Sequence, residues 1–407
     1  MRRFAVLTLL LAALPLLGGC SGGQEIEDCL FVISMAVDPA QDGSLTVTVK
    51  ALSGTQDAAT PQDASSASGG GTQDKSGEGA QGGAGAQGGA GESAEPGYVV
   101  MSATAESCLA ALNLLGATTP RTVNLSQLKE IVIARTLAET PATLTILKEI
   151  YALYEANGNA VVVVTPDDAG DLIRRQYAIF GVRLSQYLQV LFDHFEELGT
   201  VPPDANLASV IAAMESGMRD AAAVYAAAND FSATLMLAGD SPTDRLPGHL
   251  PRTSPAQNEY LGSAIFSGAR MVGTLTGQET TMLRLLSGRA VATSFALDEA
   301  MVQLSRRTRV RRTLLQEGGL PVLGADISMR VILSAGAISH TDAQLAAQIE
   351  RGAAALIAKL QAAGSDVLGY GALAARGYVD IPSWEASGWA DAYAQAGVRV
   401  TADVVIR

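Results

Sequence analysis

The sequence predicts an α+β fold of three mixed α/β domains, with largely antiparallel or mixed sheets, that follows a lipoprotein signal peptide. Two observations point to this class. Strand and helix patterns alternate along residues 98–197, which is typical of a sheet covered by helices. Pairs of strands joined by short turns occur at residues 30–50 and 261–275, and short turns indicate antiparallel pairing.

A chain of 407 residues is long enough for two or three domains, and changes in composition divide it. We expect a signal peptide at 1–19, an N-terminal α/β domain at 20–52 and 97–200, a disordered Gly/Ala/Ser-rich insert at 53–96, a middle domain at 201–292 and a C-terminal α+β domain at 293–407. The insert has no aromatic residue and cannot bury enough apolar surface to offset the entropy of ordering.

The charge balance limits the partners of the chain. Hydrophobic residues make up 48% of the sequence and charged residues 17%, which is ample for a packed interior. The net charge of −13 argues against binding to nucleic acid and against electrostatic adhesion to anionic lipid.

The N-terminus has the pattern of a lipid-modified export signal. Arg2 and Arg3 precede an apolar segment at 4–17, which is shorter than the roughly 20 residues that span a bilayer as a helix. Leu17, Gly18, Gly19 and Cys20 then form a motif similar to a bacterial lipobox, in which the cysteine sulfur is diacylated and becomes the first residue after cleavage. Acyl chains contribute about 0.8 kcal/mol per buried methylene, so Cys20 would anchor the chain to membrane lipid. The alternative is an ordinary secretory signal in which Cys20 is incidental.

Two other cysteines remain, Cys29 and Cys108. Outside the cell they could pair as a disulfide, or they could be two buried free thiols, and the sequence does not choose between these.

The N-terminal domain starts with a predicted hairpin. Residues 30–37 are apolar on both faces, as in a strand inside a sheet, and residues 44–50 alternate between apolar and polar. Beyond the insert we expect strands at 98–103, 128–134 and 160–164, helices at 105–115, 141–155 and 184–197, and a further helix capped by Asp167 and Asp168.

The middle domain is less clear. Pro202 and Pro203 indicate a boundary, and the Ala-rich sequence that follows, up to Leu237, gives no assignment. Further on we expect a strand pair at 261–266 and 270–275. Thr276 and Glu279 then form a capping box, which predicts a helix up to Leu286.

The C-terminal domain combines strands with a long helix. Five arginines between 301 and 315 could form an anion site, but we interpret them as the solvated face of a strand: Arg306, Arg307, Arg309, Arg311 and Arg312. Residues 327–333 and 398–406 are predicted strands. Thr341 and Gln344 cap a predicted helix with Leu345, Ile349, Leu356 and Leu360 on one face.

No catalytic or metal-binding pattern stands out, and we predict a protein without enzymatic activity, metal or cofactor. His194, His249 and His340 lie far apart in the sequence, without metal-ligand spacing. Ser126 and Lys129 have the Ser-x-x-Lys spacing of penicillin-binding enzymes, which requires a helix start. Because they run directly into a predicted strand, we interpret them as structural.

Several blocks, in order along the chain, carry a family resemblance: Val37-Asp38 with Asp42-Gly43; residues 125–129 before 131–133; residues 262–266 with 271–275 and 279–280; and residues 365–371 with Trp384 and Trp389. With the Cys20 motif, this ordered set resembles the spore germination C-subunit family, the lipoproteins of nutrient germinant receptors.

The resemblance implies three α+β domains and a place on the outer face of the spore inner membrane, held by Cys20. It implies a non-catalytic role in receptor assembly and in the germination response. The implied partners are two integral-membrane subunits, an A-type subunit and a transporter-like B-type subunit. Trp384 and Trp389 are the residues that we would test first as partner contacts.

A second hypothesis is a solute-binding lipoprotein that serves a transporter. Such proteins usually have two similar lobes around a cleft, and the sequence shows no internal repeat of that kind.

Overall fold

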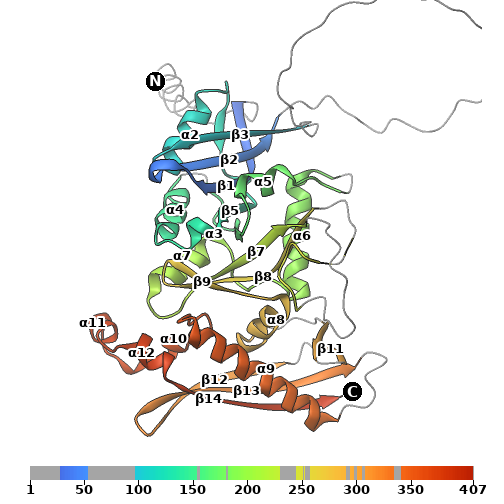
Figure 1. Ribbon diagram of the computed structural model, residues 1–407, viewed down its shortest axis with the longest axis vertical. Helices are drawn as coiled ribbons and strands as arrows, with labels where there is room; N and C mark the ends of the chain where they lie inside the picture. Colours follow the sequence, from blue (N-terminus) through green and yellow to red (C-terminus); the bar gives the residue numbers. More distant parts are fainter. Residues whose placement is uncertain are drawn as a thin grey trace, which may run out of the picture.

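The computed structural model contains two β-sheets, each packed with helices (Figure 1). It describes residues 28–53, 97–153, 156–179, 182–229, 244–250, 252, 257–289, 294–297, 300–304, 308–333 and 341–406. In Figure 1 the end with α2 and β3 lies opposite the end with β12, β13 and β14. A mixed α+β fold, as predicted, is confirmed.

The larger sheet has nine strands in the order β3-β2-β1-β5-β6-β7-β8-β9, with β4 beside β1. Parallel pairing joins β1 to β4 and β5, β5 to β6 and β6 to β7, whereas the remaining neighbours are antiparallel. Its strands are β1 (Cys29–Pro39), β2 (Leu45–Leu52), β3 (Tyr98–Ala105), β4 (Thr122–Asn124), β5 (Glu130–Ala134), β6 (Val161–Thr165), β7 (Ala222–Ala228), β8 (Asn258–Ser267) and β9 (Arg270–Leu275).

Helices cover both faces of this sheet, which explains why β1 and β6 are apolar on both sides. One face packs against α2 (Cys108–Gly116), α3 (Arg135–Ala138), α4 (Ala142–Tyr151) and α7 (Leu207–Ser216). The other face packs against α5 (Ala169–Arg174) and α6 (Leu184–Leu198).

The smaller sheet has five strands and a core of its own. The strands are β10 (Ser294–Leu297), β11 (Ala300–Leu304), β12 (Arg309–Glu317), β13 (Leu320–Leu333) and β14 (Gly397–Ile406). Both predicted capping boxes are present, at the starts of α8 (Gly277–Leu286) and α9 (Asp342–Ala362). The predicted apolar face of α9 is buried in this core. The remaining short elements are α10 (Tyr370–Ala374), α11 (Ile381–Glu385), α12 (Trp389–Ala394) and the 3₁₀ turns Gln41–Gly43 and Ala375–Gly377.

Some predictions from the sequence are wrong, and others concern residues that the structure does not describe. The Ala-rich sequence without an assignment forms α7 and β7. The boundary predicted near Pro202 falls inside the nine-stranded sheet, because β6 pairs with β7, and the division into domains there stays a prediction. Of the insert, only Ser53 is among the described residues. Cys29 and Cys108 are both buried and are not joined by a disulfide, so the disulfide alternative is wrong.

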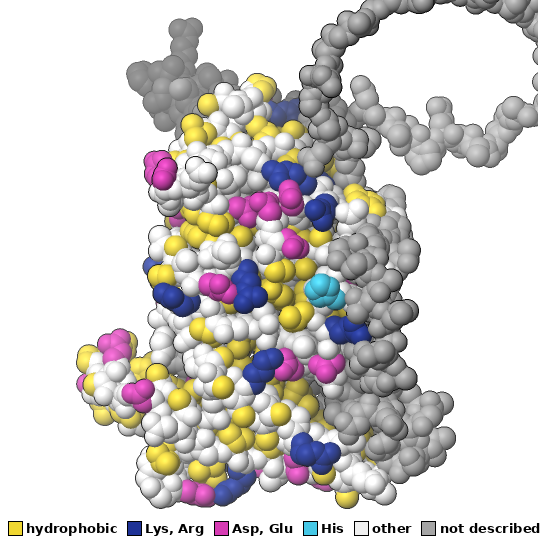
Figure 2. Space-filling view, viewed as in Figure 1, with side chains coloured by type: hydrophobic (Ala, Val, Ile, Leu, Met, Phe, Trp, Pro, Cys, Tyr) yellow, Lys and Arg dark blue, Asp and Glu magenta, His cyan; other side chains and the backbone are white. Residues whose placement is uncertain are grey.

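The arginine cluster is only partly a solvated strand face. Arg309 and Arg311 are exposed on β12, as predicted, whereas Arg312 is half-buried. Burial lowers the pKa of Arg312, and the nearby Tyr370 and Asp366 side chains oppose this effect. Arg306 and Arg307 lie outside the described residues. On the face of the molecule in Figure 2, acidic and basic side chains are interspersed.

The β8–β9 hairpin contains a glycine that no other residue can easily replace. Gly262 has φ +86°, and a Cβ there would lie 2.2 Å from the carbonyl oxygen of Leu275. We predict that Gly262→Ala lowers the free energy of unfolding by about 2–4 kcal/mol, because the strands must separate to accept the methyl group. Denaturant unfolding of the purified protein measures this.

Gly273→Ala, in the same hairpin, is the matched control. A Cβ at Gly273 would meet only the Ile265 side chain, at 3.5 Å, so its cost should stay below about 1 kcal/mol. Equal stability of the two variants would contradict the prediction.

Candidate functional site

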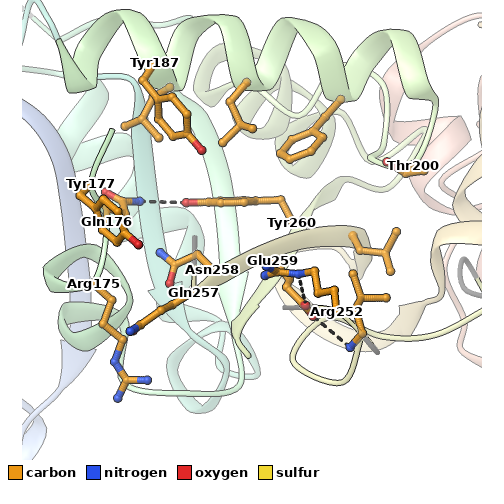
Figure 3. A pocket seen from close by; sticks show the side chains of 15 residues that line it. Arg175, Gln176, Tyr177, Tyr187, Thr200, Arg252, Gln257, Asn258, Glu259 and Tyr260 are labelled. Atoms are coloured by element: carbon orange, nitrogen blue, oxygen red, sulfur yellow. Dashed lines mark hydrogen bonds and ion pairs between the residues drawn. The ribbon is translucent and has the colours of Figure 1, made fainter. Parts of the chain in front are cut away.

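The largely apolar pocket beneath α6 is one place where the described residues could bind another molecule (Figure 3). Its volume is about 320 Å³. Tyr187 and the apolar residues of α6 form one wall, and Tyr260 of β8 lies across from them. Arg252 at the side is neutralised by Glu259, with Nε 2.6 Å from Oε1. The pocket therefore offers apolar and aromatic walls and no exposed uncompensated carboxylate.

A buried polar network lies behind this pocket. The carboxylate of Glu130 accepts hydrogen bonds from Gln176, from Tyr260 at 3.3 Å and from Ser34 at 2.8 Å. Lys50 donates to the backbone carbonyl of Gln176. Burial raises the pKa of Glu130, and these hydrogen bonds and the Lys50 charge oppose the shift. Because Glu130 is fully buried and its partners are protein groups, the network holds β1, β5 and β8 together.

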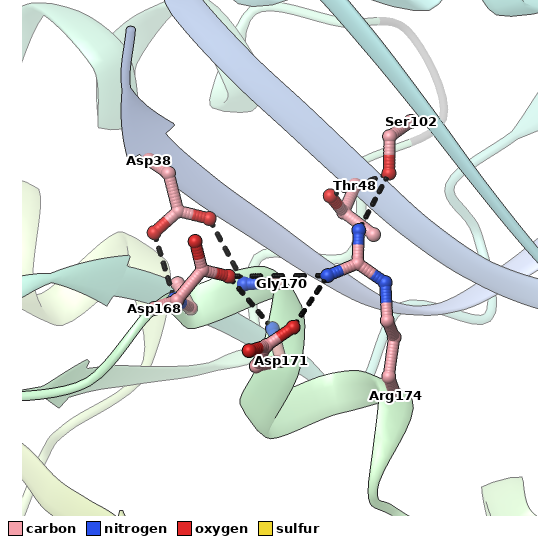
Figure 4. Close-up of polar contacts among 8 residues, drawn as sticks. Asp38, Thr48, Ser102, Asp168, Gly170, Asp171 and Arg174 are labelled. Atoms are coloured by element: carbon pink, nitrogen blue, oxygen red, sulfur yellow. Dashed lines mark hydrogen bonds and ion pairs between the residues drawn. The ribbon is translucent and has the colours of Figure 1, made fainter.

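Asp38, in one of the sequence blocks singled out above, holds α5 on the sheet (Figure 4). Its oxygens accept the backbone N–H groups of Ala169 at 2.7 Å and Gly170 at 2.9 Å. Burial raises the pKa of Asp38, and the two backbone hydrogen bonds oppose that shift. Arg174, at the end of the helix, donates to Ser102 on β3. Both contacts are structural.

The Ser-x-x-Lys tetrad and the histidines do not come together. Ser126 donates through its backbone N–H and its hydroxyl to Asn124 Oδ1, at 2.9 and 2.6 Å, in the turn between β4 and β5. Lys129 donates to Gln189 at 3.2 Å. His194 and His249 are exposed, and His340 lies outside the described residues. No group of three or more His, Cys, Asp or Glu side chains suited to a metal ion occurs in the described part of the chain.

The loop at 365–371 joins the two sheets. The Asp220 carboxylate, on the turn before β7, accepts the backbone N–H groups of Asp366 and Gly268, each at 2.7 Å. Ser365 Oγ donates to the Phe266 carbonyl oxygen of β8 at 2.6 Å. The Asp366 carboxylate accepts the backbone N–H groups of Tyr370 at 2.9 Å and of the residue after it at 2.5 Å. This loop therefore fixes α10 and the C-terminal core on the end of the larger sheet.

The two tryptophans proposed as partner contacts mainly pack where the loop at 365–371 joins the two sheets, a region that we call the joint. Trp384 is 5% exposed and donates from Nε1 to the Gly217 carbonyl oxygen at 3.2 Å. Trp389 is half-buried and donates to the Asp366 carboxylate at 3.3 Å. Their ring centroids are 6.0 Å apart. Tyr378 continues the row, 5.6 Å from Trp384.

The exposed apolar surface lies next to these rings. Val379 is 99% exposed, Ile381 at the start of α11 is 62% exposed and Tyr378 is 42% exposed. In Figure 1, α11 stands out from the side of the molecule at the end of the smaller sheet. The segment that the sequence singled out through its tryptophans thus exposes other side chains, Tyr378, Val379 and Ile381, and a partner contact there stays a prediction.

Two protein-family models match the chain in order. The model for the spore germination protein N-terminal domain matches residues 22–227, and the model described as spore germination B3/GerAC like, C-terminal, matches residues 261–407. The chain belongs to the spore germination GerAC/B3-like family. No curated protein matches it.

A solved structure supports the fold of this GerAC/B3-like chain. The chain is similar to the crystal structure of the GerBC protein, with a TM-score of 0.50 and 12% sequence identity, over 94% of this chain and 99% of that chain. The family resemblance expected from the sequence blocks is therefore confirmed. Cys20, the predicted lipidation site, lies outside the described residues and stays a prediction.

The buried Asp366 should make stability depend on pH. Burial raises its pKa to about 6, against hydrogen bonds that lower it, and an unfolded Asp titrates near 3.9. The unfolded state therefore releases this proton first as the pH rises. The stabilisation of the folded state by protonated Asp366 is therefore fully present below about pH 4, and it is lost as the pH rises through about 6.

We therefore predict that the free energy of unfolding falls by about 2–3 kcal/mol more in the wild type than in Asp366→Asn between pH 4 and 7. The variant should be less stable throughout, because an amide cannot accept both backbone N–H groups, so the slopes are compared and not the absolute values. Denaturant unfolding at several pH values measures this. Parallel pH profiles would refute the assignment.

Proposed function

We propose that the chain is the lipid-anchored, non-catalytic subunit of a spore nutrient germinant receptor, needed for receptor assembly and for the germination response. The ordered match of both family models over residues 22–227 and 261–407 is the observation that carries this proposal. The subunit would sit on the outer face of the spore inner membrane and bind two integral-membrane subunits, an A-type and a transporter-like B-type.

Acylation of Cys20 is the proposed means of attachment. The motif that ends at Cys20 has the lipobox pattern, and eight residues separate it from the start of β1 at Cys29. None of the described helices is long and apolar enough to cross a bilayer.

A non-catalytic role is supported by how the polar side chains are used. Asp38, Glu130 and Asp366 are buried and bind backbone or side-chain donors of the protein itself. Ser126 is bound to Asn124 and is not at a helix start, so Lys129 is not positioned one helical turn away from it.

The proposed contact with a receptor subunit is the apolar surface at the start of α11, made by Ile381 and by Tyr378 and Val379 just before the helix. Interfaces depend on a few aromatic and aliphatic anchors held in a fixed position. The hydrogen bond from Trp384 to Gly217 and the ring row behind α11 provide that fixation.

The pocket beneath α6 favours a second candidate function, a solute-binding lipoprotein. A cavity of about 320 Å³ is at the lower end of the size range of small-molecule sites. Thermal shift of the protein against a panel of nutrients separates the two functions, since tight binding raises Tm by mass action.

Cys20→Ala should leave the protein unanchored, because the sulfur is the proposed attachment point of the acyl chains. Cells are labelled with radioactive palmitate and fractionated, and we expect both label and membrane retention to be lost. Ser21→Ala, next to the cysteine, should retain both. A Cys20→Ala variant that keeps label and membrane association would overturn the lipoprotein proposal.

Ile381→Asp should weaken binding to the receptor subunits at least about tenfold, since an interface anchor contributes more than about 1 kcal/mol. Folding should be almost unaffected, because the side chain is 62% exposed and an acidic residue suits the first turn of a helix. Co-purification from detergent-solubilised spore membranes measures binding.

Leu320→Asp is the matched control for Ile381→Asp, because Leu320 is also apolar and exposed, at 48%, but lies at the β12–β13 turn. Equal co-purification of Ile381→Asp and wild type, with both proteins folded, would exclude α11 as the contact.

A further inference from the structure

The outer side of α2 carries exposed leucines and one exposed polar side chain, Asn113, although it faces away from the core. This helix contains no charged residue. Its inner side is buried against the larger sheet through Cys108, Ala111, Leu112 and Leu115. On the outer side Leu109 is 45% exposed and Leu114 is 51% exposed. An uncharged outer side with two exposed leucines is suited to an apolar contact.

A groove of about 580 Å³ lies beside α2, between the helix and β4. Its lining combines apolar side chains, among them Leu109, Leu112 and Val123, with a nearly equal share of polar surface. Arg121 carries the only charge among the described residues that line the groove. Its guanidinium donates to the Ser53 carbonyl oxygen at 2.9 Å. The groove thus presents mixed apolar and polar surface, with no acidic side chain among the described residues that line it.

The path of the chain ties this face to Cys20. The first residues of β1 pair with β4, Cys29 with Thr122 and Leu30 with Val123, so the start of β1 adjoins the groove. Only eight residues lie between Cys20 and Cys29. A fully extended chain of that length reaches about 30 Å at most, which limits how far this face can be from acyl chains on Cys20.

The contact that this face can make is apolar and not electrostatic. The backbone N–H groups of Leu109 and Cys108, at the start of α2, are already bound by the Glu149 carboxylate at 2.9 and 3.3 Å. The helix start is therefore not available to a phosphate group. The net charge of −13 also disfavours attraction to anionic headgroups.

We propose that the outer side of α2 together with the adjoining groove, which we call the α2–β4 face, rests on the lipid bilayer, with the exposed Leu109 and Leu114 at the boundary between headgroups and acyl chains. This inference rests on the proposed acylation of Cys20, which keeps the face close to the membrane. The acyl chains provide attachment, and the apolar face sets the orientation of the subunit on the membrane surface.

A fluorescence-quenching experiment on the full-length acylated protein tests this. Leu114→Cys is labelled with a polarity-sensitive fluorophore and reconstituted into phosphatidylcholine–phosphatidylglycerol vesicles. Cys29 and Cys108 are buried, and unsubstituted protein measures their labelling. Leu320→Cys is the matched control, since Leu320 has nearly the same exposure, 48%, at the other end of the molecule (Figure 1). Leu109→Cys takes the place of Leu114→Cys if that variant does not fold.

We expect lipids with a nitroxide on the acyl chain to quench the label at position 114 and to leave the label at position 320 bright. Flotation with the vesicles but no quenching at 114, or equal quenching at both positions, would overturn the membrane contact and leave the anchor intact. Failure of the acylated protein to float with the vesicles would overturn the anchor and, with it, the orientation.

Discussion

The arrangement of the two sheets depends on the hydrogen bonds that converge on Asp366. Its backbone N–H group binds Asp220 at 2.7 Å, and its carboxylate binds the first turn of α10 and, at 3.3 Å, Trp389. A buried carboxylate is costly unless its oxygens are hydrogen-bonded, and here every partner comes from a segment that the loop must join. The same interaction closes the loop and attaches the C-terminal core to the larger sheet.

The joint also determines which side chains reach the surface. Trp384 and Trp389 fill the space between α11, α12 and the turn at Gly217, so the residues that project are Val379 and Ile381. A contact surface supported by packed rings loses little conformational entropy when it binds. The tryptophans, which the sequence suggested as partner contacts, therefore pack inside this segment, and the contact that we propose uses their exposed neighbours.

Local signals made most elements predictable, and long-range contacts did not. The sequence signal of a capping box or a hairpin lies within a few neighbouring residues. The structure confirms the capping boxes at Thr276 and Thr341 and both predicted hairpins. Alanine favours helices, yet here it also fills a buried strand, so the Ala-rich composition did not distinguish α7 from β7. The contact between Asp220 and Asp366 joins residues 146 positions apart, and no periodicity encodes such a pairing. The pocket beneath α6 arises in the same way, from side chains of α6 and β8.

The α2–β4 face and the apolar surface at the start of α11 are connected through the larger sheet and the loop at 365–371, which suits the proposed subunit that links a membrane to other proteins. The α2–β4 face adjoins the start of β1, whereas α11 follows the loop that packs on β7 and β8. Strands β1, β5, β6, β7 and β8 lie side by side in one sheet, so the two ends are connected by continuous backbone hydrogen bonds. A membrane contact at α2 would therefore hold α11 at a fixed height above the bilayer, as the proposed contact between α11 and a receptor subunit requires.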